Sequence, residues 1–582
     1  MLPFVIVLLF SLVCCYDYRY RDFEGMIKAM KQLQELYPEL VEVSTIEKEY
    51  DMRSQLQCGT LSCDHWFLRL RNKRLHENRY ELPQLFLSGE LHGNERVAPN
   101  ALLELALFLL QNRAHFDSSY QSSHPANSFP SNPASNFDPL YAFLLDSREI
   151  VIMPMTNAWG FFRSRRDENG IDVNRDFPFD PLHPSLPCLQ SETSRAIQTL
   201  YAHSLLAATA TFHGGMRSIT YEWGDYHNHA RKALAPDFAA MHAVATLMNQ
   251  LSGRWYAVGT SNDVVYPVHG GMEEWGYAAS WFDRLAAAST VPARCAGNRS
   301  VVLAPASNRC VTFLVETTDV KTPPQPQLGD TEHLFHGEVP RKGQFVPIVM
   351  RQALAVVETL RPYSIMGPIR VENGTVEVRW TVGGCFEVDM TKVVAIPSTP
   401  QLEGIVDVGQ NRGDLSDAEY ALLSAALNTT HLAETPSLKR PSPLHQNLSS
   451  LNLADDRNRA HFNASLALAP GRYLLVVVSR VDAFLQVPPA KAHPAVAPQS
   501  LFVQLRTDAV YRSGERVLRG RPVVLSRPVL VSLRGEPVRD DVVVALPALL
   551  RLPSSLPLLP VVSGWWLIVM NVACLLFLLC LL

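Results

Sequence analysis

The residue types best suited to chemistry are a histidine and a carboxylate placed three positions apart, His92 and Glu95, in the stretch Leu85–Asn100 (LFLSGELHGNERVAPN). An imidazole and a carboxylate are two of the three protein ligands that a catalytic zinc site needs, with the fourth position left for water. A His-x-x-Glu pattern is short enough to occur by chance, so by itself it is better interpreted as two polar loop residues. A metal site requires a third ligand from elsewhere in the chain.

Two further residues stand at the ends of apolar segments. His213 follows the small-residue segment 207–212 (AATATF) and precedes two glycines, as a third metal ligand in a tight site would. A core histidine with satisfied hydrogen bonds is the alternative. Glu316 ends the apolar segment 311–315 (VTFLV). Because a buried carboxylate costs free energy unless it is paired or functional, Glu316 is a candidate catalytic group.

A polar segment at residues 157–178 (NAWGFFRSRRDENGIDVNRDFP) carries several arginines and an Asn–Arg pair. Guanidinium groups bind carboxylates through two parallel hydrogen bonds. The segment therefore predicts an anion-binding site, and a solvated basic loop is the alternative.

The elements that must position these residues alternate between strands and helices. Apolar runs predict strands at residues 41–46, 65–70, 82–87, 149–153, 207–212 and 311–315. Helical periodicity predicts helices at residues 22–38, 98–110, 191–202, 235–251 and 346–360. This alternation predicts an α/β fold with a mostly parallel or mixed sheet, in which ligands gather at the strand ends.

The pattern of apolar and polar residues changes from about residue 366. Short alternating runs such as IRVENGTVEVRWTV and RYLLVVV are separated by turn residues, which is typical of a β-sandwich. A polar, partly helical insertion is expected at about residues 400–460. No role is predicted for residues 480–550 beyond completing this β-rich domain.

Both ends of the chain are apolar. Residues 1–15 (MLPFVIVLLFSLVCC) have the length and composition of a signal peptide, with a buried N-terminal element as the alternative. Residues 561–582 are long enough to span a bilayer, and they fit either a GPI-anchor signal or a terminal membrane anchor.

The cysteines and glycosylation motifs fit an exported chain. Six cysteines lie outside the apolar ends, and the local pairs expected among them are Cys58–Cys63 and Cys295–Cys310. Asn-x-Ser/Thr sites occur at Asn298, Asn373, Asn428, Asn447 and Asn463. A net charge of −4 and a pI near 6.5 give no electrostatic reason to expect nucleic-acid binding.

Five motifs in this order resemble those of the zinc metallocarboxypeptidase family, and within it the regulatory group of carboxypeptidases E, N, D and M. They are HGNE (92–95), GIDVNR (170–175), HGG (213–215), GGMEEWGY (270–277) and FLVE (313–316). The resemblance covers roughly residues 20–360 and implies a mixed eight-stranded sheet flanked by helices. The APGRY run at Ala469–Tyr473 resembles part of the transthyretin-like domain of that group.

The resemblance implies a role for each matching residue. His92, Glu95 and His213 would bind one zinc ion per chain, and Asn174, Arg175 and Tyr277 would bind the substrate's terminal carboxylate. Arg165 would polarise the scissile carbonyl, with Arg166 as the less favoured substitute. Glu316 would be the general base. The implied domains are a signal peptide (1–15), a catalytic domain (16–362), a transthyretin-like β-sandwich (363–550) and a hydrophobic anchor or GPI signal (561–582).

The chain also departs from the family's pattern. Gly224 stands eleven residues after His213, where the regulatory group has an acid, and an insertion between Tyr277 and Glu316 falls where the side-chain pocket is lined. Acidic residues nearby that could still favour a C-terminal Lys or Arg are Glu222, Asp225 and Asp283.

These observations predict an exported, membrane-anchored, cell-surface or extracellular zinc exopeptidase. It would remove a single C-terminal residue, preferentially Lys or Arg, from peptides or proteins. A catalytically silent peptide-binding module and a hydrolase of amino-acid conjugates are the alternatives. The full set of implied catalytic groups argues against the silent module, and substrate profiling separates the two hydrolases.

Overall fold

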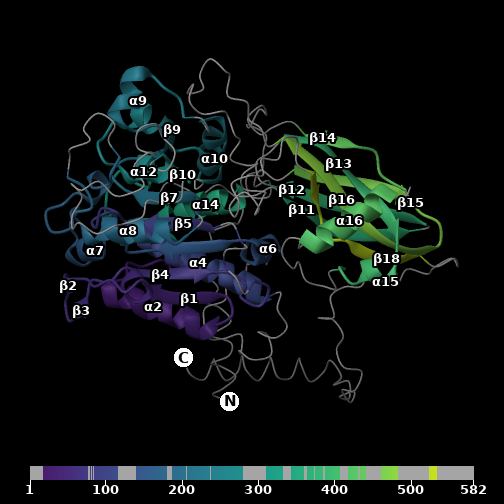
Figure 1. Ribbon diagram of the computed structural model, residues 1–582, viewed down its shortest axis with the longest axis horizontal. Helices are drawn as coiled ribbons and strands as arrows, with labels where there is room; N and C mark the ends of the chain where they lie inside the picture. The colour runs from purple at the N-terminus through teal and green to yellow at the C-terminus, as the bar shows by residue number, and fades with distance from the viewer. Residues whose placement is uncertain are drawn as a thin grey trace, which may run out of the picture.

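The computed structural model describes most of the chain in two parts, an α/β part and a β-rich part (Figure 1). The described residues are 17–76, 79, 82, 84–115, 139–179, 187–204, 206–235, 238–278, 310–331, 343–359, 363–372, 374–383, 387–406, 417–429, 433–440, 460–482 and 523–533. The predicted signal peptide, the predicted C-terminal anchor and Asp283 lie outside these residues. Among the described residues, no helix combines the length and hydrophobicity needed to cross a membrane.

An eight-stranded sheet forms the centre of the α/β part. Its strands, in spatial order, are β1 (Val41–Thr45), β4 (Trp66–Leu70), β6 (Glu149–Met153), β5 (Gln84–Gly89), β7 (Leu206–His213), β10 (Val311–Glu316), β8 (Ser218–Tyr221) and β9 (Ala257–Thr260). The four central strands run parallel to one another, whereas β1, β4 and β8 pair antiparallel to their inner neighbours. The predicted α/β fold with a mixed sheet is confirmed.

Helices cover the sheet on both faces, as Figure 1 shows. The longer ones are α2 (Phe23–Leu36), α4 (Val97–His115), α6 (Pro139–Ser147), α8 (Glu192–Ala202), α10 (Phe238–Leu251) and α14 (Phe345–Thr359). The shorter ones are α3 (Ile46–Glu49), α7 (Ala158–Arg163), α9 (Tyr226–Arg231), α11 (Ser261–Val264) and α12 (Met272–Ala278), with 3₁₀ turns η2 (Val173–Arg175) and η3 (Gln325–Gln327).

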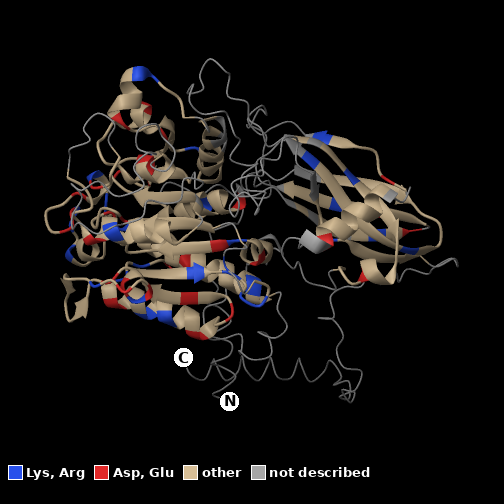
Figure 2. Cartoon of the chain, in the orientation of Figure 1, with Lys and Arg blue, Asp and Glu red and all other residues tan. Residues whose placement is uncertain are grey.

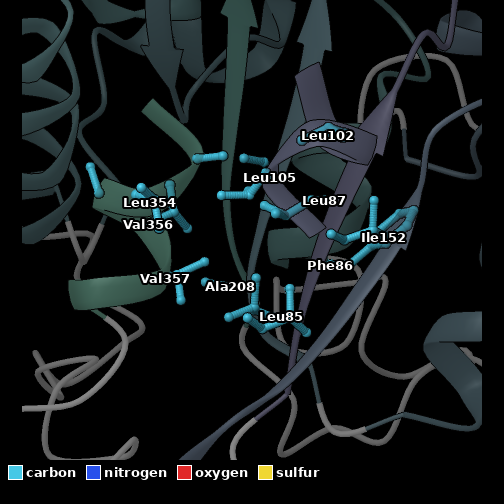
Figure 3. Close-up of a cluster of buried hydrophobic side chains, with 14 of the residues drawn as sticks. Leu85, Phe86, Leu87, Leu102, Leu105, Ile152, Ala208, Leu354, Val356 and Val357 are labelled. Carbon is cyan, nitrogen blue, oxygen red and sulfur yellow. The ribbon is translucent and has the colours of Figure 1, made fainter. Parts of the chain in front are cut away.

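The central strands are mostly apolar because helices bury both of their faces, and the few polar residues on them are largely buried as well. Every residue of β5 is buried, and Figure 3 shows Leu85, Phe86 and Leu87 in one cluster with apolar side chains of β6, β7, α4 and α14. Burial of this kind contributes about 25 cal/mol per Å² of apolar surface and fixes the strands in place. The strand ends, and the turns that follow them, are therefore held rigidly.

Two sheets form the β-rich part. One contains β11 (Tyr363–Glu372), β12 (Thr375–Gly383) and β15 (Ala460–Ala467). The other contains β14 (Leu438–Arg440), β13 (Glu387–Pro397), β16 (Gly471–Asp482), β17 (Val523–Leu525) and β18 (Val529–Leu533), and two helices, α15 (Pro400–Glu403) and α16 (Asp417–Thr429), accompany them. The buried indole of Trp380 on β12 donates a hydrogen bond of 2.8 Å to Thr391 Oγ1 on β13, which links the two sheets. That this part is a transthyretin-like β-sandwich stays a prediction.

One of the two local disulfide predictions is confirmed and the other is wrong. Cys58 and Cys63, on the hairpin of β2 (Gln57–Cys58) and β3 (Leu61–Ser62) with its following loop, are bonded to each other. Cys310 is instead a free, buried thiol, enclosed just before β10 and 3.2 Å from Thr209 Oγ1. Cys188 is also disulfide-bonded. Sequence proximity suggested a pair for Cys310, but core packing between β7 and α8 encloses it.

Candidate metal centre

The turn between β5 and α4 presents His92 and Glu95 at the carboxyl edge of the sheet. Gly93 permits this turn because a Cβ at this position would collide with the backbone of Gly160. The guanidinium of Arg96 further fixes the turn by donating to the Phe161 carbonyl oxygen at 2.7 Å. The HGNE turn is thus packed directly on α7.

The third predicted ligand reaches the same place through strand register. β5 and β7 are parallel neighbours in which Gly89 pairs with Phe212, so the turn after β5 lies beside the last residue of β7, His213. β10 is the next parallel strand, and its last residue, Glu316, pairs with His213. Carboxyl ends of parallel strands are where ligands bind in open α/β sheets.

The spacing of the three side chains fits a metal ion. His92 Nδ1 and His213 Nδ1 lie 3.1 Å apart, and each lies close to one carboxylate oxygen of Glu95, at 3.1 and 3.0 Å. Two ligand atoms bonded to a tetrahedral zinc ion at about 2.0–2.1 Å would lie about 3.3 Å apart. All three residues are buried, and they are the one group of histidine, cysteine and carboxylate side chains suited to a metal among the described residues.

The electrostatics of the cluster also favour a cation. Burial would raise the pKa of Glu95, but its hydrogen bonds with His213 and His92 outweigh burial and hold the pKa well below its usual value. Burial would likewise lower the pKa of His213, yet the Glu95 carboxylate raises it. The carboxylate is thus kept ionised and compensated by positive charge, which a bound metal would supply once the histidines are deprotonated.

The carboxylate of Asp172 contacts His92, one of the proposed metal ligands. Its Oδ1 lies 3.1 Å from His92 Nε2, the ring nitrogen that faces away from the other ligands. Burial opposes ionisation of Asp172, but hydrogen bonding to His92 and the charge of Arg166 hold its pKa below the usual value. Carboxylates in this position orient a ligating imidazole and raise its basicity. Sequence analysis missed this residue, although it lies within the GIDVNR motif.

The structure separates the two neighbouring arginines. The side chain of Arg165 is 59% exposed and pairs with Asp167 at 3.2 Å. Arg166 instead lies at the cluster, with Nη1 3.1 Å from His92 Nδ1 and Nη2 2.9 Å from Asp172 Oδ2. Arg166 is thus the arginine next to the proposed metal ligands. The family resemblance made it the less favoured candidate for polarising the scissile carbonyl.

The Asn174–Arg175 pair is held by α12. Buried Asn174 accepts a hydrogen bond from the Met272 backbone N–H at 2.8 Å and donates one to Glu273 Oε1 at 3.3 Å. Glu273 Oε1 in turn lies 3.9 Å from His213 Nε2. Gly270 makes the close approach possible, since it has a φ of +63° and a Cβ there would lie 2.5 Å from the Arg175 carbonyl oxygen. The 3₁₀ turn η2 and α12 therefore form one unit beside the metal ligands.

Glu316 has the environment of a proton-transfer group. Its carboxylate is partly buried, and its Oε2 has no hydrogen-bond partner in the part of the chain that the structure describes. Burial raises its pKa, opposed by the positive charge of His213 and reinforced by Glu95. Lys321 lies on the same side of the cluster, with Nζ 2.8 Å from Glu95 Oε1.

Tyr277 completes the set of predicted residues. It lies on α12, one turn after Glu273, and its side chain is fully buried against the ring of Trp223, with a centroid distance of 5.5 Å. The structure thus brings His92, Glu95, His213 and Glu316 together, places Asn174 and Arg175 on the adjoining turn, and leaves Arg165 facing solvent.

Part of the chain is similar to known proteins. Residues 26–309 match the zinc carboxypeptidase family. This segment is a zinc carboxypeptidase domain. The relatives include Carboxypeptidase SOL1 of Arabidopsis thaliana, 30% identical over 199 residues, and Carboxypeptidase M of Mus musculus, 25% identical over 296 residues. The family resemblance predicted from the five motifs is confirmed.

The similarity covers only part of each protein. The SOL1 match spans 32% of this chain and 36% of SOL1, and the Carboxypeptidase M match spans 46% of this chain and 59% of that relative. Among solved structures, thrombin activatable fibrinolysis inhibitor is 14% identical with a TM-score of 0.36, over 58% of this chain and 75% of that chain.

Proposed function

We propose that this chain is a zinc-dependent exopeptidase that removes one C-terminal residue from peptides or proteins, with a preference for Lys or Arg. The observation that carries the proposal is the meeting of His92, Glu95, His213 and Glu316 at the ends of three parallel strands of a zinc carboxypeptidase domain. One zinc ion per chain would be held by the first three residues. When bound, zinc lowers the pKa of a water molecule to about 7 and polarises a carbonyl group.

The end of the substrate would be recognised by the unit formed from η2 and α12. Arg175 would bind the terminal carboxylate through its guanidinium, with Asn174 donating a further hydrogen bond and Tyr277 closing over the bound residue. Cleavage within a chain would leave Arg175 without a carboxylate, so this arrangement favours release of a single terminal residue.

Glu316 would carry the proton. Its carboxylate would take a proton from the attacking water as the water oxygen bonds to the scissile carbonyl carbon, and would return it to the leaving amine as the C–N bond breaks. An arginine beside the ligands would stabilise the negative charge on the carbonyl oxygen, a contribution of about 3 kcal/mol per donor. The family resemblance implies this role for Arg165, and the geometry favours Arg166.

The setting of the enzyme is part of the proposal. We infer an exported protein with a signal peptide at residues 1–15, a catalytic domain at 16–362, a transthyretin-like β-sandwich at 363–550 and a membrane anchor or GPI signal at 561–582. Two of the five glycosylation motifs, at Asn428 and Asn463, have exposed asparagines on α16 and β15, which is the accessibility that glycan attachment requires.

The test is hydrolysis of N-blocked dipeptides ending in Arg, Lys, Phe, Leu or Glu by wild type and Glu316→Gln, with and without a chelator. We expect chelator-sensitive release of one residue that is lost in Glu316→Gln. Absence of turnover in a folded, zinc-loaded sample would favour a binding module or a hydrolase of amino-acid conjugates instead.

A further inference from the structure

Three buried carboxyl groups interact with one another, and one of them also interacts with Arg175, the residue proposed to bind the terminal carboxylate. Asp225 follows β8, and Glu273 and Glu274 begin α12; each is less than 5% exposed. Glu274 interacts electrostatically with the other two carboxyl groups and, more weakly, with Arg175. A group of buried acids with one cation favours a second positive charge, which the substrate could bring.

Two of these acids already have partners. Asp225 begins α9, accepting from the Asn228 backbone N–H at 2.9 Å and from Asn228 Nδ2 at 2.7 Å. Glu273 accepts from Asn174. Glu274 differs, because no side chain among the described residues donates a hydrogen bond to it and its carboxylate receives only its own backbone N–H.

The position of the Glu274 carboxylate is defined by two glycines. Its Oε1 lies 2.3 Å from the place that a Cβ at Gly224 would take, and its Oε2 lies 2.4 Å from the place that a Cβ at Gly271 would take, so a side chain at either position would collide with the carboxylate. Gly224 is the residue at the offset where the regulatory carboxypeptidases place an acid. The carboxyl group of Glu274 therefore occupies the space of a side chain at position 224, although it comes from a helix instead of the segment after β8.

We propose that Glu274 is the residue that selects a basic terminal side chain, in place of an acid at position 224. This inference rests on the proposed carboxypeptidase function, since it assumes that Arg175 holds the terminal carboxylate. A substrate bound in that way would direct the ammonium or guanidinium of its terminal Lys or Arg to the Glu274 carboxylate.

The titration of Glu274 gives this selection a pH dependence. Burial first, and then the negative charges of Glu273 and Asp225, raise the pKa of Glu274 to about 8, while Arg175 opposes the rise. Only the ionised carboxylate pairs with a cation. Binding of a basic residue should therefore release a proton and strengthen as the pH rises through about 8, whereas binding of an uncharged residue should not change in this way.

The experiment compares N-blocked dipeptides ending in Lys and in norleucine, which have similar length but different charge. We expect Glu274→Gln to lower the kcat/KM for Lys at least tenfold relative to norleucine while norleucine turnover persists. Glu273→Gln is the matched control on the same helix; because Glu273 holds Asn174, we expect it to weaken both substrates equally. In wild type the Lys-to-norleucine ratio should rise between pH 6.5 and 9.

Binding measured without turnover separates this inference from the proposed function. Calorimetry measures the affinities of zinc-loaded wild type and Glu274→Gln for N-acetyl-lysine and N-acetyl-norleucine. We expect wild type to prefer N-acetyl-lysine and Glu274→Gln to lose that preference. A protein that hydrolyses neither dipeptide but prefers N-acetyl-lysine through Glu274 would refute the proposed function and keep this inference. An unchanged Lys-to-norleucine ratio in Glu274→Gln, or a wild-type ratio that is flat with pH, would overturn it; if Glu274→Gln does not fold, the wild-type pH series decides.

Discussion

At the scale of single residues, the contact between Asp172 and His92 Nε2 gives the clearest prediction. Asp172→Asn removes the charge that orients the imidazole, and loss of such a carboxylate typically costs 10–100-fold in metal affinity. We expect the zinc dissociation constant to rise by about that factor in competition with a chromophoric chelator. Asp167→Asn is the control, because Asp167 pairs with Arg165 away from the ligands; equal affinities for both variants would contradict the role.

The two arginines permit a paired test of the carbonyl-polarising role. Because Arg166 contacts His92 and Arg165 points to solvent, we expect Arg166→Gln to lower kcat by roughly 100-fold and Arg165→Gln to change it less than about threefold. Steady-state kinetics on the preferred dipeptide measures both variants. A larger loss of kcat in Arg165→Gln than in Arg166→Gln would instead support Arg165, the residue that the family resemblance implies.

The sequence indicated the three residues that the structure brings together as a possible metal site, but it could not choose between these arginines. His92, Glu95 and His213 follow from residue type and from strand ends, which are visible as changes in apolar pattern. The direction of Arg165 and Arg166 depends on the backbone after α7, where Ser164 has a φ of +52°. No sequence pattern encodes that turn. Asp172 was missed for a similar reason, since only the folded loop brings it to His92.

At the scale of elements, burial decides what the sequence reveals. The strands at 149–153 and 311–316 were found to within one residue because both of their faces are covered and most of their residues are apolar. The short helices α7 and α12 were not predicted. α12 is seven residues long and contains two buried glutamates and Gly276, so it has no apolar period to detect.

A buried polar network joins α3, α8 and the residue just before β4, close to the loop that follows Arg165 and Arg166. His65, just before β4, lies 2.6 Å from Glu47 Oε1 on α3 and 3.0 Å from Thr193 Oγ1 on α8. The Thr193 hydroxyl also donates to Glu168, which lies between Arg166 and Asn174 in the chain. Thr193 has one hydroxyl proton, so it can donate to Glu168 only if His65 donates from both ring nitrogens. The network is therefore complete when His65 is protonated.

This network predicts a pH-dependent contribution to stability. Burial would lower the pKa of His65, but Glu47 raises it above the usual value of about 6.5. A raised folded-state pKa means that the contribution is fully present below about pH 6.5 and is lost as the pH rises through the folded-state value. Urea unfolding should show that His65→Gln destabilises the protein at pH 6 by roughly 1–3 kcal/mol, and by less at pH 9. His203→Gln, at an exposed site, should change little at either pH; an equal loss for His65→Gln at both values would exclude the protonated network.

At the scale of the whole molecule, the two parts are expected to unfold as one unit. Buried hydrophobic residues of the α/β part, such as Leu87 and Val357, belong to the same continuous core cluster as Val378 and Val477 of the β-rich part. Figure 2 shows positive and negative residues interspersed in both parts, which limits electrostatic repulsion between them. Calorimetry should therefore show a single main transition, and two separate transitions would contradict this coupling.

Zinc should shift that transition as a whole. An ion that binds only the folded state stabilises it by about 2.7 kcal/mol at a free concentration of 100 times its dissociation constant. The ion would connect the turn before α4 to the end of β7, so its loss should destabilise the whole central sheet. We expect zinc to raise the melting temperature of the full chain by a few degrees, and we expect Glu95→Gln, which removes one ligand, to abolish most of the shift. A second transition that does not respond to zinc would instead show that the β-rich part unfolds on its own, and would limit the influence of the metal to the α/β part.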